Sequence, residues 1–145
     1  MLRDPSVHEV KGASQVFERL KRSGVRVALD TGFSRSIARV ILDRLSWAQT
    51  ELIDATICSD EVPRGRPHPD MIFQLMDQLG VTDARAVVKV GDTPVDLEQG
   101  RRAGCGLVIG VLGGTHTREQ LELYPHSHLI DTIALLPGLL ALSTD

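Results

Sequence analysis

The sequence of 145 residues predicts an α/β fold in which a parallel sheet carries helices on both faces. Hydrophobic periodicity alternates along the chain between helix-like and strand-like segments. Three of the four main strand-like segments are near-continuous aliphatic runs, as expected for strands that are buried on both faces. Helix-like segments separate the strands, and this is the connection that neighbouring parallel strands require.

The elements of the first half follow from this periodicity. Residues 9–23 predict a helix, because Val16, Phe17 and Leu20 recur at helical spacing and Gly24 then provides a natural end. The chain continues with a strand at 25–30, a helix at 34–45, a strand at 54–60, a Pro- and Gly-rich loop at 61–69 and a helix at 70–79.

The second half repeats the alternation and marks its helix ends with specific residues. A strand at 86–92 leads into a helix with Thr93 at the N-cap, Pro94 at N1, Asp96 at N3 and Gly104 just past its end. The last elements are a strand at 106–112, a helix from Thr117 with Gln120 as capping-box partner, a short strand at 128–130 and a helix around 133–142.

Composition and charge restrict the function classes. Hydrophobic residues make up 42% and charged residues 24% of the chain, which is the balance of a globular protein. The net charge of −3 leaves no basic excess for nucleic acid or an anionic membrane, and 3% aromatic residues cannot form a base-stacking platform. The apolar stretch near the end is about ten residues long and contains a proline, so it is too short to span a bilayer. We therefore expect no nucleic-acid and no membrane partner.

The cysteines and the first residues indicate the compartment. Cys58 and Cys105 lie in apolar segments, so we interpret them as small core residues rather than disulfide partners or metal ligands. The opening MLRDPSVHEV has neither the apolar region of a signal peptide nor the character of a transit peptide. We expect a cytoplasmic, reducing location.

Candidate metal ligands follow the strand at 86–92. In a parallel α/β sheet, ligands bind beyond the carboxyl ends of the strands. Asp92 ends this strand, and Asp96 lies in the first turn of the next helix. Two carboxylates beside a helix N-terminus could hold a hard cation such as Mg²⁺. A capping box with Thr93 would by itself explain Asp96, but it would not explain Asp92.

Two other segments could bind an anion. Thr31 and Gly32 leave a strand with a hydroxyl group and backbone N–H groups near the start of a helix. Arg66 lies between Gly65 and Pro67, where the restricted backbone would preset its guanidinium for a bidentate phosphate contact. Each segment also has a simpler interpretation. Thr31 and Gly32 could form a common turn, and Arg66 could be a solvated loop arginine.

The order of these segments resembles the haloacid dehalogenase superfamily of phosphohydrolases, and within it the phosphonatase-like branch. The resemblance covers essentially the whole chain and rests on TGFSR at 31–35, GRPHPD at 65–70, and VKVGDTPVDLEQGRRAG at 88–104 followed by GVLGG at 110–114. It implies a three-layer Rossmann-like fold, Mg²⁺ as cofactor, and a small phosphorylated or phosphonate metabolite as substrate.

The resemblance also implies roles for the matching residues. Thr31 would bind a phosphoryl oxygen as a catalytic and substrate-binding residue, with Gly32 beside it as a substrate-binding residue. Arg66, where many members have lysine, would neutralise the phosphate and orient the nucleophile. Asp92 would ligate Mg²⁺ directly, and Asp96 would ligate it or orient its water. In the family, an aspartate attacks phosphorus in line and water then hydrolyses the aspartyl-phosphate.

The family's nucleophile motif, Asp-x-x-Gly-Thr on an N-terminal strand before a helical cap, has no counterpart here. Asp30 cannot replace it because it belongs to the second motif, and Asp4 follows no apolar run. The cap lysine of a phosphonatase is also unmatched, since neither Lys89 nor Lys11 occupies its place. We therefore expect a single partial core domain without a cap, and we predict that Met1 is an internal methionine of a longer protein.

The strand that carries this nucleophile is central in the family's sheet, between the strands that here end at Asp30 and Asp92. These two strands should either pair with each other directly or leave unpaired backbone through which the chain could oligomerise. Two functions remain open at this stage. The chain is a phosphohydrolase core, inactive on its own, or a non-catalytic phosphate-binding or regulatory module derived from the same fold.

Overall fold

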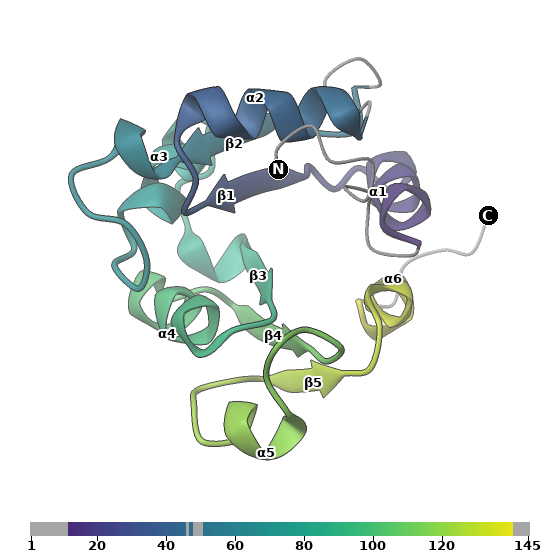
Figure 1. Ribbon diagram of the computed structural model, residues 1–145. Helices are drawn as coiled ribbons and strands as arrows, with labels where there is room; N and C mark the ends of the chain where they lie inside the picture. Colours follow the sequence, from purple (N-terminus) through teal and green to yellow (C-terminus); the bar gives the residue numbers. More distant parts are fainter. Residues whose placement is uncertain (1–11, 46, 48–50, 141–145) are drawn as a thin grey trace. The chain divides into compact units, whose positions relative to one another are not determined.

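A computed structural model describes residues 12–45, 47 and 51–140 (Figure 1). The chain divides into two compact units: unit 1 comprises Met1–Glu61 and Ile133–Asp145, and unit 2 comprises Val62–Thr132. Each unit has its own parallel sheet and its own helices, so the predicted α/β class is confirmed.

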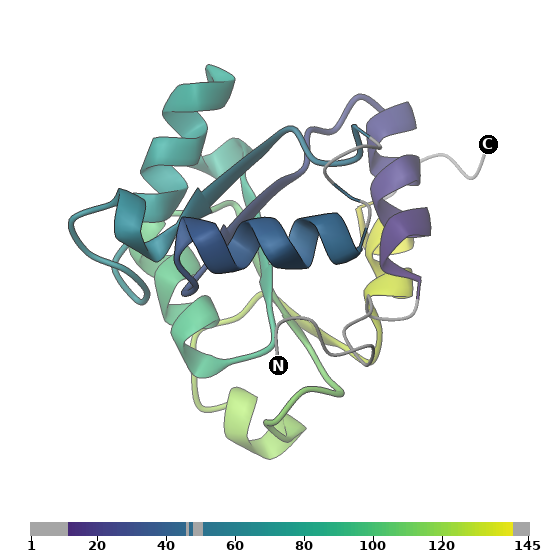
Figure 2. The ribbon, with the colours of Figure 1, turned by 45° about the horizontal axis from the view of Figure 1, so that its top comes forward.

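Unit 1 is built on a two-stranded parallel sheet, in which Thr31 lies opposite Cys58. Its elements are α1 (Ala13–Arg22), β1 (Ala28–Thr31), α2 (Arg35–Arg44), β2 (Ala55–Cys58), η1 (Ser59–Glu61), η3 (Ile133–Leu135) and α6 (Leu136–Leu139). The helix α2 connects the two parallel strands and packs along β2 (Figure 2). The N-terminal helix α1 contacts η3 and α6 from the other end of the sequence.

The apolar face predicted for α1 provides part of the core of unit 1. Val16 and Leu20 are buried, and the Phe17 ring packs edge-on against Trp47 with the ring centroids 5.1 Å apart. Cys58 is fully buried and its burial raises the pKa of its thiol, whereas Cys105 of unit 2 is half-buried. The prediction of a core position is therefore confirmed for Cys58, whereas Cys105 is only partly buried.

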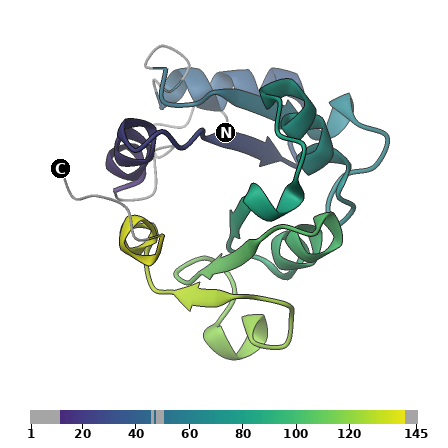
Figure 3. The same ribbon diagram turned by 180° about the vertical axis from the view of Figure 1, so that it is seen from behind.

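Unit 2 is built on a three-stranded parallel sheet in the order β3-β4-β5 (Figure 3). Its elements are α3 (Asp70–Leu79), η2 (Ala84–Ala86), β3 (Val88–Gly91), α4 (Pro94–Ala103), β4 (Leu107–Val111), α5 (Arg118–Leu121) and β5 (His128–Ile130). The central strand β4 is the most buried of the three. Leu97 of α4, Val108 of β4 and Leu121 of α5 form its core cluster.

The helix ends of unit 2 match their sequence signals. Thr93 and Asp96 form a complete capping box at the start of α4, and Thr117 and Gln120 form another at α5. Gly104 ends α4 in the left-handed conformation, with φ of 78°. These local interactions fix the direction in which α4 leaves β3, and the candidate carboxylates lie at this junction.

The strands that end at Asp30 and Asp92 do not pair with each other, because β1 and β3 belong to different sheets. Within the described residues, β1 has only β2 as a ladder partner and β3 has only β4. No helix in the described part of the chain is long and apolar enough to cross a membrane.

Candidate functional site

The carboxylate of Asp96 is the centre of a hydrogen-bond network in unit 2. Its Oδ2 accepts hydrogen bonds from the backbone N–H groups of Asp92 and Thr93, both at 3.2 Å, and from the Thr93 hydroxyl at 2.9 Å. Its Oδ1 accepts a hydrogen bond from Nη1 of Arg66 at 2.6 Å and lies 3.7 Å from Nζ of Lys89. The Asp96 side chain is only 6% exposed.

This network keeps Asp96 ionised. Burial by itself raises the pKa of the carboxyl, but the charge of Lys89 and the hydrogen bonds from Arg66 and Thr93 outweigh it, so the pKa of Asp96 lies below its ordinary value. Asp96 therefore carries a negative charge at neutral pH, held by two cations and three hydrogen-bond donors from the β3–α4 junction.

Arg66 lies in a loop that a backbone hydrogen bond and an ion pair stabilise. The backbone N–H of His68 donates to the carbonyl of Gly65 at 3.0 Å and closes a turn around Arg66. Arg64 forms an ion pair with Asp70, the first residue of α3, at 3.1 Å. The Arg66 side chain is 28% exposed, and in the described residues its only hydrogen bond is the one from Nη1 to Asp96. The other guanidinium N–H groups can therefore donate to a ligand.

Asp92 is exposed at the end of β3 and differs from Asp96 in having no hydrogen bond to its carboxylate within the described residues. It packs against Gly114, where a Cβ atom would lie 2.4 Å from Oδ2 of Asp92. The glycine thus leaves room for the carboxylate beside the chain segment that follows β4.

Asp92 and Asp96 fit a Mg²⁺ site in which water and phosphate oxygens supply most of the ligands. Mg²⁺ takes one or two carboxylates in such sites and completes its shell with water and phosphate oxygens. Asp92 offers an available carboxylate, whereas both oxygens of Asp96 already accept hydrogen bonds. In the described ranges there is no group of three or more His, Cys, Asp or Glu side chains that could hold a metal by themselves.

Thr31 and Gly32 belong to unit 1 and follow β1. Oγ1 of Thr31 accepts a hydrogen bond from the backbone N–H of Phe33 at 3.1 Å, which shapes the turn into α2. The first N–H of α2, that of Arg35, donates to the carboxylate of Asp60 at 3.1 Å. The backbone N–H groups of Phe33 and Arg35 are therefore already used in hydrogen bonds within unit 1. The Thr31 hydroxyl accepts one of these bonds and can still donate its own proton.

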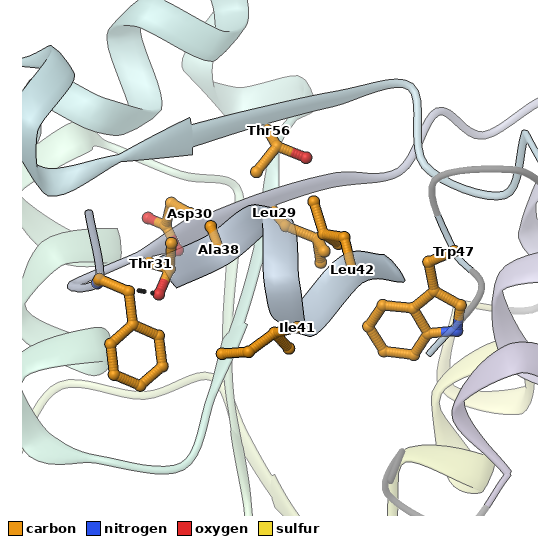
Figure 4. Close-up of a pocket in the computed structure, with 9 residues that line it drawn as sticks. Leu29, Asp30, Thr31, Ala38, Ile41, Leu42, Trp47 and Thr56 are labelled. Atoms are coloured by element: carbon orange, nitrogen blue, oxygen red, sulfur yellow. Dashed lines mark hydrogen bonds between the residues drawn. The ribbon is translucent and has the colours of Figure 1, made fainter. Parts of the chain in front are cut away.

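Next to this turn, unit 1 has a pocket of about 180 Å³ between β1 and α2 (Figure 4). Asp30 and Thr31 lie at one end, and the wall is mostly apolar. The apolar lining comes from Leu29, Phe33, Ala38, Ile41, Leu42 and Trp47.

The structure brings three of the sequence-predicted site residues together in unit 2, since Arg66 and the backbone of Asp92 both bind the Asp96 carboxylate. Sequence reasoning did not anticipate the Arg66–Asp96 ion pair, because the two residues are 30 positions apart. It considered Lys89 only as a possible cap lysine and did not place it beside Asp96, although a single lysine among the valines of a predicted buried strand was a visible signal.

Comparison with known proteins agrees with the motif order. Residues 1–110 match the model of the haloacid dehalogenase-like hydrolase family, so the chain belongs to this family. A phosphonoacetaldehyde hydrolase of Bordetella avium is 34% identical over 155 aligned positions, covering 91% of this chain and 55% of the relative. One of Bacillus cytotoxicus is 35% identical over 116 positions, covering 78% of this chain and 44% of the relative.

Solved structures show the same fold. A phosphonoacetaldehyde hydrolase-like protein of Oleispira antarctica matches with a TM-score of 0.78 at 25% identity, covering 91% of this chain and 55% of that one. A haloacid dehalogenase family hydrolase of Deinococcus radiodurans, with bound phosphate and sodium, matches with a TM-score of 0.80 at 25% identity, covering 91% and 58%. The chain spans about half the length of the curated relatives it matches.

Proposed function

We propose that this chain carries the phosphate- and Mg²⁺-binding part of a phosphonatase-like phosphohydrolase. The observation that carries the proposal is that one buried carboxylate, Asp96, fixes both the guanidinium of Arg66 and the backbone of Asp92. An arginine with unused N–H donors and an available carboxylate are the groups that a phosphate bound with a hard cation requires.

In this proposal each residue has a defined task. Arg66 neutralises the phosphoryl group through its unused N–H groups, and Thr31 donates its hydroxyl to a phosphoryl oxygen, with Gly32 beside it. Asp92 holds Mg²⁺, which when bound supplies positive charge to the phosphoryl oxygens. Asp96 keeps Arg66 and the β3–α4 junction in place, and it is also the residue that could orient a water of the metal.

The substrate class rests on the relatives. The curated relatives reported above are named phosphonoacetaldehyde hydrolases and share about a third of their aligned residues with this chain. We propose a small phosphorylated or phosphonate metabolite as substrate and a cytoplasmic location. We further propose that residues 1–145 form one partial core domain without a cap, and that copies of the chain could associate through a strand edge.

The sequence has no Asp-x-x-Gly-Thr segment, so we propose that this chain binds phosphate and Mg²⁺ without turning over a substrate. The same observation favours a second candidate, a binding or regulatory module derived from the family fold. Both candidates predict binding by the isolated chain, and they differ in what a longer chain from the same gene would do.

The test measures binding and turnover separately. Calorimetry with inorganic phosphate in the presence of Mg²⁺ should show binding by the isolated chain, and Arg66→Met should abolish it. Turnover of phosphonoacetaldehyde and of a generic phosphomonoester should stay at background. A longer chain that includes an in-frame Asp-x-x-Gly-Thr segment should gain turnover if the protein is an enzyme. Absence of phosphate binding by the isolated, folded chain would contradict both candidates.

A further inference from the structure

Gln99 is a buried polar residue that the proposed roles leave unused. It lies in α4, and its side chain is completely buried. Neither Nε2 nor Oε1 of its amide has a hydrogen-bond partner within the described residues. Buried amides normally make hydrogen bonds, and one that makes none costs stability that an apolar side chain of the same size would not. The Gln99 amide therefore contributes nothing to the stability of unit 2 in the structure.

Gln99 lies one helical turn after Asp96 on α4. The buried residues of this helix are Asp96, Leu97, Gln99, Gly100 and Ala103, so Gln99 is the only buried polar side chain on α4 besides Asp96. Residues three positions apart on a helix have Cβ atoms about 5–6 Å apart. Side chains on a helix also lean toward its N-terminus, which directs Gln99 toward the turn that contains Asp96.

The two oxygens of the Asp96 carboxylate have different surroundings. Oδ2 accepts hydrogen bonds from the N–H groups of Asp92 and Thr93 at the β3–α4 junction. Oδ1 lies 3.7 Å from Nζ of Lys89, whose stem packs against α4, since a Cβ atom on Gly100 would lie 3.0 Å from Cβ and from Cγ of Lys89. Oδ1 is therefore turned to the buried side of α4, the side on which Gln99 also lies.

The hydrogen bond that Oδ1 accepts comes from a group with a second task. Nη1 of Arg66 donates to Oδ1 at 2.6 Å, and the proposed function directs the same guanidinium to a phosphoryl group. Phosphate is a strong guanidinium ligand, so it competes with Asp96 for Arg66. When the guanidinium turns toward phosphate, Oδ1 needs another donor, because the Asp96 side chain is only 6% exposed and a buried carboxylate oxygen without a donor is costly.

We propose that Gln99 is a positioning residue for phosphoryl binding, and that its Nε2 donates a hydrogen bond to Oδ1 of Asp96 when the guanidinium of Arg66 turns to the phosphoryl group. This inference rests on the proposed function, because it assigns a phosphoryl group to Arg66. Gln99 does not touch the ligand. It acts through Asp96, which keeps its place at the β3–α4 junction while Arg66 binds phosphate.

Gln99→Met tests the inference, because methionine keeps the length of the buried side chain and removes the amide. Without phosphate, the loss of an unpaired amide should raise the urea midpoint of unfolding. The dissociation constant for inorganic phosphate, measured by calorimetry without Mg²⁺, should rise about tenfold, the usual effect of losing one hydrogen bond to a charged group. A residue that only fills the core would change the stability and leave the phosphate affinity of the folded protein unchanged.

Gln78→Met is the matched control. Gln78 lies in α3 and is exposed, so the same substitution there removes an amide that is in contact with water. Both the urea midpoint and the phosphate affinity should stay at their parent values. A second measurement follows the amide in the parent protein. The NMR signal of the Gln99 side-chain amide should shift when the protein is saturated with phosphate, because Nε2 then gains an acceptor.

The outcomes separate the two proposals. A folded Gln99→Met variant with unchanged phosphate affinity overturns the role of Gln99 while the proposed function stands, and this is also the result expected if Lys89 supplies the replacement donor. If Gln99→Met does not fold, the NMR signal decides: a shift on saturation with phosphate supports the inference, and an unchanged signal overturns it. If the parent itself does not bind phosphate, the proposed function is contradicted, and the inference falls with it.

Discussion

A Cβ atom on Gly91 would lie 2.3 Å from the Cβ of Asp96 and 2.4 Å from its Cγ, so β3 ends against the first turn of α4 without any space for a side chain. This close approach allows the N–H groups of Asp92 and Thr93 to reach Oδ2 of Asp96 at 3.2 Å. The orientation of the candidate site in unit 2 therefore depends on a glycine that offers no chemistry of its own.

Replacing Gly91 by alanine should disturb this junction. The atoms that the new methyl group would meet belong to the Cβ and Cγ of a buried side chain, so they cannot move without shifting the start of α4. We expect Gly91→Ala to lower the free energy of unfolding by about 1–3 kcal/mol, the usual cost of overpacking, as measured by urea denaturation.

Gly138→Ala serves as the control for the Gly91 variant. Gly138 lies in α6, and nothing is found within 4 Å of the position its Cβ would take. This variant should be neutral or slightly stabilising. Equal stability of the two variants would mean that β3 and α4 adjust freely, contrary to the close contact between Gly91 and Asp96.

The lowered pKa of Asp96 predicts a specific dependence of stability on pH. A carboxyl with a lower pKa in the folded state stabilises the fold above its unfolded pKa, and this contribution is lost as the pH falls through the folded value. We therefore expect the stability difference between the parent and Asp96→Asn to shrink as the pH is lowered from about 5 to about 2, in urea unfolding at each pH.

The loss of the ion pairs of Asp96 must be separated from this effect. Asp96→Asn removes the carboxylate that pairs with Lys89 and Arg66, and breaking a buried ion pair costs about 3–5 kcal/mol. The comparison is therefore repeated in the Lys89→Met background, where the Lys89–Asp96 pair is absent from both variants. A pH-independent difference between Asp and Asn in both backgrounds would show that the Asp96 carboxyl does not titrate abnormally.

The contact between Asp92 and Gly114 predicts how Mg²⁺ binding responds to substitution. Gly114→Ala would place a methyl group 2.4 Å from Oδ2 of Asp92 and force this carboxylate into another rotamer. We expect Mg²⁺ affinity, measured by calorimetry in the presence of phosphate, to fall for Gly114→Ala and to fall further for Asp92→Asn. Unchanged Mg²⁺ affinity in Asp92→Asn would exclude this residue as the metal ligand.

The sequence predicted those parts of the fold that local interactions determine. The capping box of Thr93 with Asp96 and the left-handed Gly104 depend on residues a few positions apart, so both ends of α4 could be predicted. Strand ends were less accurate. Residues 86–92 were expected as a strand, but β3 covers Val88–Gly91, because apolar runs do not mark where a ladder of hydrogen bonds begins and ends.

The candidate site was predictable residue by residue but not as an arrangement. Asp92, Asp96 and Arg66 were recognised from motif order, whereas the pairing of Arg66 with Asp96 depends on how the loop before α3 folds back over the start of α4. Residue types could not distinguish the two carboxylates, one exposed and the other almost completely buried. Only the packing shows that Asp92 is exposed, as the proposed metal ligand must be, and that the buried Asp96 carboxylate pairs with Arg66.

An ion pair joins α2 to η1, the short helix that follows β2 in unit 1. Arg35 contacts Glu61 through Nη2 at 2.6 Å and Nε at 3.1 Å, and its Nη2 also donates to the carbonyl of Thr56 at 2.8 Å. Glu61 in turn accepts a hydrogen bond from the backbone N–H of Cys58 at 2.9 Å. The hydrogen bonds from Arg35 are the largest cause of the lowered pKa of Glu61.

Both side chains are about one-third exposed, so solvent screens much of the attraction, but the paired geometry and the backbone contacts should leave a measurable contribution. We expect Glu61→Gln to destabilise unit 1 by about 1 kcal/mol in urea unfolding at neutral pH, with a smaller effect below about pH 4, where the carboxyl becomes protonated. Asp83→Asn is the control, because its pair with Arg85 is far more exposed and should contribute little. If the two variants lose the same stability, the backbone contacts of the Arg35–Glu61 pair add nothing, and the connection between α2 and β2 rests on apolar packing alone.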